Sequence, residues 1–181
     1  MGLAIENKLL PSLLTFHSYS SRILRAQFNG KGRNLSVLVG YAPTNAATTS
    51  DDDRDKFYTD LQQAHDDCGL QDVKLVLMDG NVETGDRREL FPNLMGPHAV
   101  PEVGPFTETT PNGERFIDFC IRNNLILGYS WFQKPIKKNP YVCSTFFPNN
   151  PQHMPKTIDH VLIDGRSKSN LLDVHVRHDI Q

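Results

Sequence analysis

The stretch VKLVLMDGNVETGD (Val73–Asp86) decides how the rest of the chain is interpreted. Its apolar first half has the composition of a buried β-strand, which Asp79, Gly80 and Asn81 bring to an end. Ligand sites of layered α/β folds gather where strands end, and a carboxylate there can bind Mg²⁺ or accept a proton from water. The alternative interpretation is that Asp-Gly simply forms a turn, which is a common use of this dipeptide.

If the end of this strand is a ligand site, Asn81 adds a second polar side chain to it. If the extended conformation continues past Asp79, the amide of Asn81 points to the same side and can donate to an anionic oxygen. In the alternative interpretation Asn81 only caps the turn.

Segments on both sides of this strand indicate its neighbours. The runs Arg22–Phe28 and Leu35–Tyr41 alternate like strands and are separated by the turn sequence NGKGRN, which predicts a β-hairpin. A helix is expected to begin at the carboxylates Asp51 to Asp53 and to continue through RDKFYTDLQQAHDDC. Its inward face is predicted to carry Phe57, Leu61 and Ala64.

The second half of the chain predicts one more helix and several strands. The helix is NGERFIDFCIRNNL, with Phe116, Phe119 and Cys120 facing inward. The long polar segment Gly85–Pro111 before it is typical of a functional loop. The expected later strands are Leu125–Tyr129, Val142–Phe146, Thr157–Ile163 and Leu172–Val176. Strands on both sides of helices, together with a hairpin, favour an α/β or α+β sandwich.

Two further positions belong to the candidate site. Asp159 interrupts the apolar strand TIDHVLI, where an unpaired buried charge would cost several kcal/mol, so it is suited to orient an imidazole or to bind a metal. A strand whose Asp159 faces solvent is the alternative. Tyr41 closes a strand before Pro43, so its hydroxyl is expected at the same sheet end as Asp79, unless it is merely a tyrosine at a strand edge.

The bulk composition limits the possible partners. The 181 residues, 38% hydrophobic and 22% charged, fit one globular domain with a formal charge of −2, which gives no overall footprint for nucleic acid. Three separated cysteines indicate neither a disulfide scaffold nor a zinc site, and no run reaches transmembrane length. We therefore expect an intracellular protein, nuclear or cytoplasmic, without membrane contact. Three lysines in QKPIKKNP can contact DNA phosphates, or form a solvated basic loop: Lys134, Lys137 and Lys138.

Taken in order, these stretches resemble the endonuclease/exonuclease/phosphatase superfamily, whose members include deoxyribonuclease I. The resemblance is closest to the endonuclease domains of LINE-type retrotransposons and to craniofacial development protein 2-like proteins. It runs through SSRILRAQFNGKGRNLSVLVGYAPTN, KFYTDLQ, DGNVETG, NGERFIDFCIRNNLILGYSWFQKPI, STFFP, TIDHVLI and LLDVHVR. It implies a four-layered α/β sandwich, in which two facing mixed β-sheets are flanked by helices.

The resemblance also implies an activity, which is hydrolysis of DNA phosphodiesters by an activated water with Mg²⁺ or Mn²⁺ and no other small-molecule cofactor. Asp79 would then deprotonate the water and Asn81 would help to hold it, while Tyr41 would contact the phosphate. Asp159 matches the aspartate that steadies a catalytic histidine. The metal is expected to bind weakly, with Asp79 as its ligand.

The chain departs from this family at several points. Two early strands with an Asn and a metal-binding Glu are expected before its first residue, and a terminal Asp-His motif after its last, so residues 1–181 are expected to form a single, truncated domain with an incomplete sandwich. Met78 and Gly80 replace the family's Gly and Phe beside the aspartate. A catalytically inactive remnant that binds nucleic acid or protein therefore stands as the alternative function. The sequence leaves the oligomeric state open.

Overall fold

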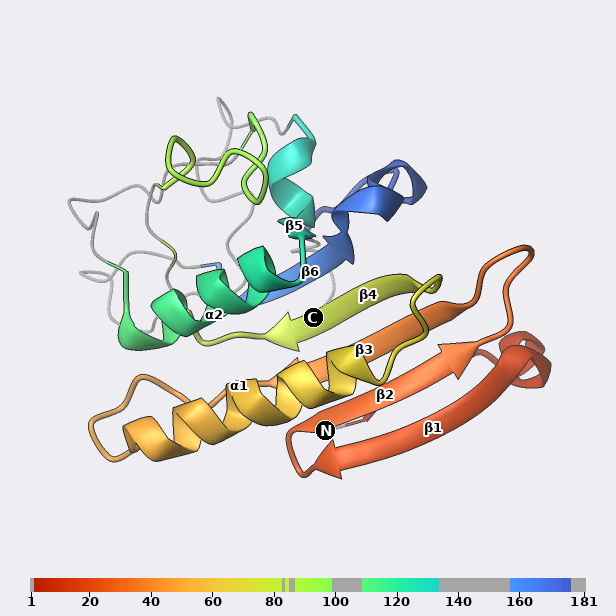
Figure 1. The fold of residues 1–181 in the computed structure, drawn as a ribbon, viewed down its shortest axis with the longest axis horizontal. Coiled ribbons are helices and arrows are strands. Elements are labelled where there is room, and N and C mark those ends of the chain that lie inside the picture. The colour runs from red at the N-terminus through yellow and green to blue at the C-terminus, as the bar shows by residue number, and fades with distance from the viewer. Residues whose placement is uncertain (1, 83, 85–86, 99–108, 134–156, 177–181) are drawn as a thin grey trace.

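The computed structural model describes residues 2–82, 84, 87–98, 109–133 and 157–176, and a six-stranded mixed sheet forms its centre (Figure 1). The strands follow the order β1-β2-β3-β4-β6-β5, in which only the β3–β4 pair is parallel. Their bounds are β1 (Leu13–Ser20), β2 (Ile23–Phe28), β3 (Leu35–Tyr41), β4 (Val73–Asp79), β5 (Leu125–Leu127) and β6 (Asp159–Asp164). The predicted hairpin is the antiparallel pair β2–β3.

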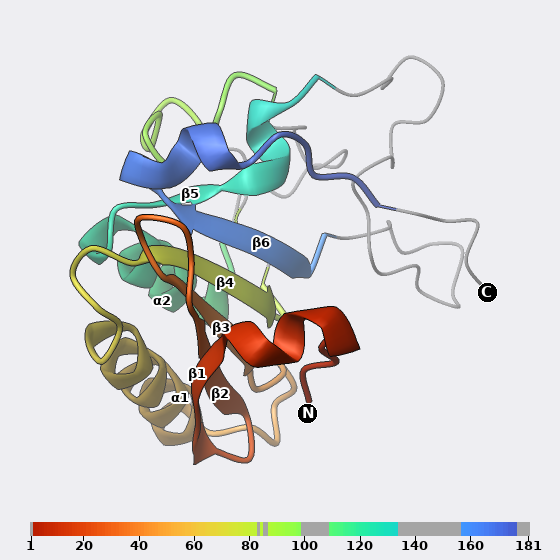
Figure 2. The ribbon, with the colours of Figure 1, turned by 90° about the vertical axis from the view of Figure 1, so that its right-hand side faces the viewer.

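Two α-helices cover one face of this sheet (Figures 1 and 2). Helix α1 (Asp51–Asp66) connects the parallel strands β3 and β4, and it begins at the N-cap Ser50, whose hydroxyl accepts a hydrogen bond from the Asp53 backbone N–H. Helix α2 (Pro111–Arg122) begins after Thr110, which caps the Gly113 N–H in the same way. The described residues also form three short 3₁₀ helices: η1 (Asn7–Ser12), η2 (Gly128–Trp131) and η3 (Gly165–Asn170).

The hydrophobic core lies between the helices and the sheet. Alternate residues of β3, β4 and β6 point into it, and the helix residues predicted to face inward are all buried. These are Phe57, Leu61 and Ala64 of α1, and Phe116, Phe119 and Cys120 of α2. The periodicity of both helices was therefore sufficient to predict which of their faces is buried.

The opposite face of the sheet carries no α-helix in the part of the chain that the structure describes. The short helix η1 lies on this side (Figure 2). Large apolar side chains remain exposed along the β1 edge, with Leu14 at 50% and Phe16 at 56% exposure. The mixed sheet and its flanking helices confirm the predicted α/β class, and the described residues hold one of the two sheets of the expected sandwich.

Several predicted elements differ in the structure. Strand β1 was not predicted, and β5 ends at Leu127 because Gly128 begins a 3₁₀ helix. The prediction of a strand at Leu172–Val176 was wrong, since this segment has neither helical nor strand pairing. Val142–Phe146 lies outside the described residues. None of the described helices has the length and the apolar character that crossing a membrane requires.

Candidate functional site where β3, β4 and β6 meet

The sheet places three of the predicted residues in one row. Tyr41 is the register partner of Asp79 across the parallel pair β3–β4, and Asp79 is the partner of Asp159 across the antiparallel pair β4–β6. Register partners project from the same face of a sheet, so the phenol and the two carboxylates are neighbours on the helix-free face. The parallel β3–β4 pair and the antiparallel return of β6 bring these distant positions together.

Asp79 also shapes the turn that follows it. Its Oδ1 accepts a hydrogen bond of 3.1 Å from the Asn81 backbone N–H, so the Asp-Gly pair is a turn as well as the end of a strand. Asn81 has a φ of 47°, in the left-handed region, and its Nδ2 donates to the carbonyl oxygen of Ala42 at 3.0 Å. The extended conformation therefore does not continue to Asn81, whose side chain ties the turn to the end of β3.

Asn112, which the sequence interpretation did not identify, supports this turn from the helix side. It is fully buried at the start of α2, and its Nδ2 donates to the carbonyl oxygens of Pro43 at 2.9 Å and Gly80 at 3.1 Å. One amide thus fixes both the loop after Tyr41 and the turn after Asp79. An N-terminal helix position next to a proline gives no sequence signal for such a contact.

His160 packs behind the same turn, on the opposite face from Asp159. Its ring lies 4.7 Å from the Phe116 ring, and a side chain at Gly80 would meet its Cδ2 at 3.0 Å. Burial lowers the pKa of His160 to about 3, so the ring is neutral near pH 7. Because His160 and Val82 occupy this space, glycine at position 80 fits a site where a larger side chain would force a shift.

The electrostatics of the row centre on Asp79. Partial burial raises the pKa of its carboxyl, the nearby charge of Asp159 raises it further, and the Asn81 N–H acts in the opposite direction. Mg²⁺ is commonly held by one or two carboxylates together with waters and substrate phosphates, and a cation here would relieve the repulsion between the two carboxylates. The Asp79–Asp159 pair therefore fits a weak Mg²⁺ site. No group of three or more His, Cys, Asp or Glu suited to a metal occurs among the described residues.

Replacing Asp79 with Asn is expected to raise the melting temperature at pH 7 by about 1 to 3 °C. A carboxyl whose pKa is raised on folding favours the folded state only while it is protonated, and its ionised form opposes folding at higher pH. Asn keeps an acceptor for the Asn81 N–H without the charge. Melting curves between pH 3 and pH 8 test this, because the difference between the variant and wild type should shrink as Asp79 becomes protonated. A variant that melts below wild type at pH 7 would contradict the assigned electrostatics.

The row borders a cavity of about 680 Å³ on the helix-free face. Apolar side chains of the sheet form its floor, while the C-terminal end of the described chain forms the opposite wall. Its lining includes Tyr41, Asp79, Asp159, His160, Val174 and His175. This space, called the site cavity below, lies next to both carboxylates.

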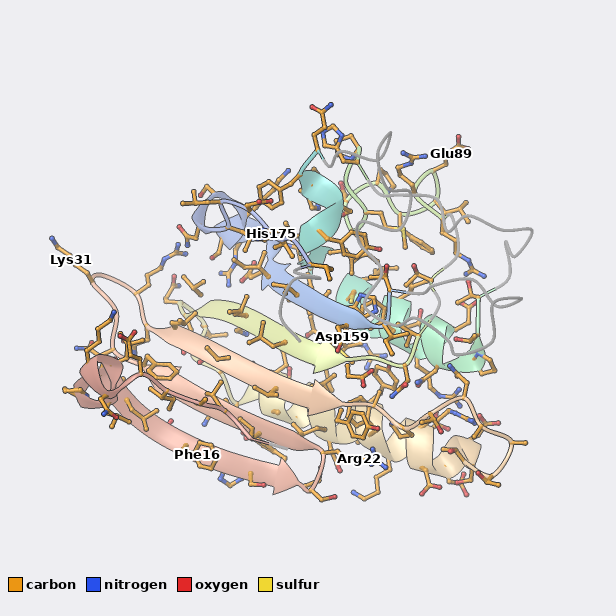
Figure 3. All side chains as sticks on the ribbon, turned by 180° about the vertical axis from the view of Figure 1, so that it is seen from behind. Phe16, Arg22, Lys31, Glu89, Asp159 and His175 are labelled. Atoms are coloured by element: carbon orange, nitrogen blue, oxygen red, sulfur yellow. The ribbon has the colours of Figure 1, made fainter. Side chains whose placement is uncertain are left out.

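Arg22 adds a positive charge at this end of the sheet. Its guanidinium lies 5.2 Å from the centre of the Tyr41 ring, and its Nη1 donates to the Tyr41 carbonyl oxygen at 3.2 Å. Figure 3 shows Arg22 and Asp159 at the same end of the sheet, and Lys31 at the other. Sequence interpretation did not give Arg22 a role at the site, although it is the first residue of the predicted strand that pairs with the Tyr41 strand.

Other predicted positions fall outside the described residues. These are the lysines Lys134, Lys137 and Lys138, whose contact with DNA stays a prediction.

Comparisons with known proteins support the resemblance. The chain is 28% identical over 138 residues to craniofacial development protein 2 of both Tragulus javanicus and Bos taurus, which is 76% of this chain and 22% of each relative. The chain thus spans less than a quarter of the length of these relatives. No family model matches the chain.

A solved structure with a similar fold supports the sheet-and-helix arrangement. The crystal structure of the AP endonuclease LMAP from Leishmania major superposes with a TM-score of 0.53 at 12% identity, over 82% of this chain and 47% of that one. The endonuclease domain of TRAS1, a telomere-specific non-LTR retrotransposon, gives a TM-score of 0.47 at 8% identity, over 78% of this chain and 49% of that one. The chain thus resembles the AP endonuclease LMAP in fold and craniofacial development protein 2 in sequence.

Proposed function

We propose that this chain, which has the endonuclease/exonuclease/phosphatase fold, hydrolyses phosphodiester bonds of DNA with the help of Mg²⁺ or Mn²⁺. The observation that carries the proposal is the row Tyr41–Asp79–Asp159 beside the site cavity. A phenol that can donate to a phosphate, a partly buried carboxylate that can accept a proton, and a second carboxylate are the groups that metal-assisted hydrolysis uses.

Each residue has a definite part in this reaction. Asp79 accepts the proton of the attacking water. Tyr41 donates its hydroxyl hydrogen to a phosphate oxygen, and Asn81 holds the turn in place through Ala42. Asp79 and Asp159 would hold the metal, which supplies Lewis-acid stabilisation of the phosphate charge.

Nicking of supercoiled plasmid DNA tests the proposal. The protein is expected to convert supercoiled plasmid into open circles when Mg²⁺ is present, and EDTA is expected to stop the conversion. Binding of DNA without any nicking, on plasmid and on oligonucleotides with an abasic site, would contradict the hydrolytic function and support the alternative of a binding module.

Replacing Arg22 with Ala is expected to weaken DNA binding and to make the affinity less dependent on salt concentration. Each phosphate contact releases counterions, so losing one should make the slope of log Kobs against log[salt] shallower by about one unit. Fluorescence anisotropy with a labelled duplex at several salt concentrations measures this slope. Lys31→Ala is the matched control, since Lys31 is exposed at the opposite end of the sheet (Figure 3). Equal slopes for Arg22→Ala and wild type would remove Arg22 from the contact surface.

A further inference from the structure

The edge strand β1 ends the sheet with an exposed row of backbone groups. In the strand order β1 is outermost, and within the described part of the chain it pairs only with β2. The backbone N–H and C=O groups on its outer side therefore form a template on which a further strand can pair. Figure 3 shows the β1 residue Phe16 at this outer edge of the sheet.

Apolar side chains gather beside this edge. Phe16 lies on the helix-free face, because it is the register partner of Ala26, whose neighbour Arg25 donates to the carbonyl oxygen of Asp67 at the end of α1 on the other face. Exposed apolar side chains that cluster mark interaction surfaces, whereas single ones do not. Among the described residues, four of the nine exposed large apolar side chains lie within eight consecutive positions of η1 and β1: Leu9, Leu10, Leu14 and Phe16.

The sequence of β1 does not protect this edge. Its eight residues, LLTFHSYS, contain no Asp, Glu, Lys, Arg or Pro, although natural edge strands use charged side chains and proline to prevent pairing. β-Bulges, another protective device, interrupt the register with β2 between Leu13 and Thr15 and between Ser18 and Ser20. The centre of the strand, from Thr15 to Ser18, pairs with β2 residue for residue. This centre is open to a partner strand.

The absence of acidic and basic side chains other than His17 favours a second copy of this chain as the partner. A two-fold axis places a surface against itself, so each charge on β1 would come close to the same charge on the copy. In an antiparallel pair about such an axis, each face of the sheet continues into the same face of the copy, and opposite residues share a face. The axis therefore passes through a residue of the centre and not between two residues.

Phe16 is the central residue that suits this axis. With the axis at Phe16, the two phenyl rings meet on the helix-free face, where aromatic pairs are favourable. With the axis at His17, two imidazoles would oppose each other, although the His17 ring already packs edge-on against Tyr19 at 4.5 Å between ring centres. We propose that this chain forms a two-fold dimer in which β1 pairs antiparallel with its own copy about Phe16. The dimer joins two six-stranded sheets into one and does not depend on the proposed hydrolysis.

Sedimentation velocity of the 181-residue chain between about 10 μM and 1 mM tests the dimer, since an interface of one short strand pair is small and weak. The average mass is expected to rise from 20.5 kDa toward twice that value as the concentration increases. Phe16→Lys should lower the association constant by about tenfold or more, because it removes the aromatic pair and opposes two ammonium groups.

Leu90→Lys is the matched control for this variant, since Leu90 is an exposed leucine outside η1 and β1 and its replacement should leave association unchanged. Melting curves show whether both variants remain folded. A wild-type mass that stays at 20.5 kDa throughout would overturn the proposal. Association of Phe16→Lys as strong as that of wild type, or equal weakening by Leu90→Lys, would overturn it as well.

Disulfide cross-linking tests the register of the pair. Phe16→Cys places two thiols directly opposite each other, at a separation that suits a disulfide, so mild oxidation should trap a covalent dimer. Ser18→Cys is the control, because position 18 faces position 14 of the other copy and its two thiols lie too far apart. Wild type, with its own three cysteines, gives the background. Pairing about Phe16 is wrong if Phe16→Cys cross-links no more than wild type, or if Ser18→Cys cross-links as readily.

Discussion

Replacing Asp79 with Asn is expected to lower the nicking rate on supercoiled plasmid by about 10²- to 10⁴-fold, the range for loss of a general base. Asn keeps the shape of the side chain and an oxygen acceptor for the Asn81 N–H, so the turn should survive. It removes the proton-accepting carboxylate and one of the two charges suited to Mg²⁺. The loss should therefore appear in the rate of cleavage at saturating DNA, with little change in DNA affinity.

The control for this variant is an exposed aspartate that is remote from the cavity. Asp52→Asn, in the first turn of α1, should nick at the wild-type rate because Asp52 is exposed and does not line the site cavity. The assay is best run on supercoiled and abasic-site DNA with Mg²⁺. Cleavage that persists unchanged in Asp79→Asn would remove Asp79 from the chemistry, whatever the affinity for DNA.

Replacing Asn112 with Leu is expected to have the largest effect on stability, lowering the free energy of unfolding by about 2 to 4 kcal/mol. Leu has a similar volume but leaves the carbonyl oxygens of Pro43 and Gly80 without their buried donor. Part of the cost is offset, because the Asn112 Oδ1 is itself buried without a partner among the described residues. Both carbonyls belong to segments that position Tyr41 and Asp79. The nicking rate should therefore fall by a larger factor than the fraction of folded protein does.

Urea unfolding followed by circular dichroism measures this change. Nicking is assayed without urea, at a temperature where the variant is folded. Asn123→Leu is the matched control. Asn123 also uses its Nδ2 for two hydrogen bonds, to the Gln62 Oε1 and the Phe119 carbonyl oxygen, but it is half-buried, so water can replace them. Equal losses of stability in the two variants would show that the buried bridge from Asn112 has no special importance.

Local patterns predicted a large part of this fold. The β2–β3 hairpin and the two helices follow from alternation, from helical periodicity and from turn residues such as Gly30 and Gly32, each of which is encoded within a few positions. Tyr41 and Asp79 were identified because each ends an apolar strand, and Asp159 because it interrupts a predicted one that in the structure begins at this residue. The order of these motifs along the chain is what resembles the endonuclease/exonuclease/phosphatase superfamily.

The elements that were missed depend on neighbours distant in sequence. Strand β1 exposes both of its faces for most of its length, so its residues lack the alternation that a half-buried strand shows. The segment Leu172–Val176 has a strand-like composition, but it lies against Gly128 and not beside another strand. Arg22 and Asn112 matter through single contacts with Tyr41, Pro43 and Gly80, and no spacing rule indicates such contacts.

The turn after Asp79 was difficult for a different reason. The backbone conformation at Asn81 decides whether its side chain lies on the same side of the sheet as that of Asp79. The φ of 47°, in the left-handed region, turns the side chain away from the expected direction. Asparagine adopts this region more readily than most residues, which is consistent with an Asn after Asp-Gly. The sequence thus predicted the position of this turn and left the role of its last side chain open.

The central claim is that the sheet end formed by β3, β4 and β6 binds the phosphodiester backbone. Backbone-amide NMR during titration with a DNA duplex that carries uncleavable phosphorothioate linkages tests it most directly, because the readout requires no turnover. The account predicts the largest shift changes at the amides of Ala42, Gly80 and Asn81, with the β2–β3 turn around Lys31 unchanged. Shifts concentrated at that turn, or none at the Asp79 end of the sheet, would contradict it.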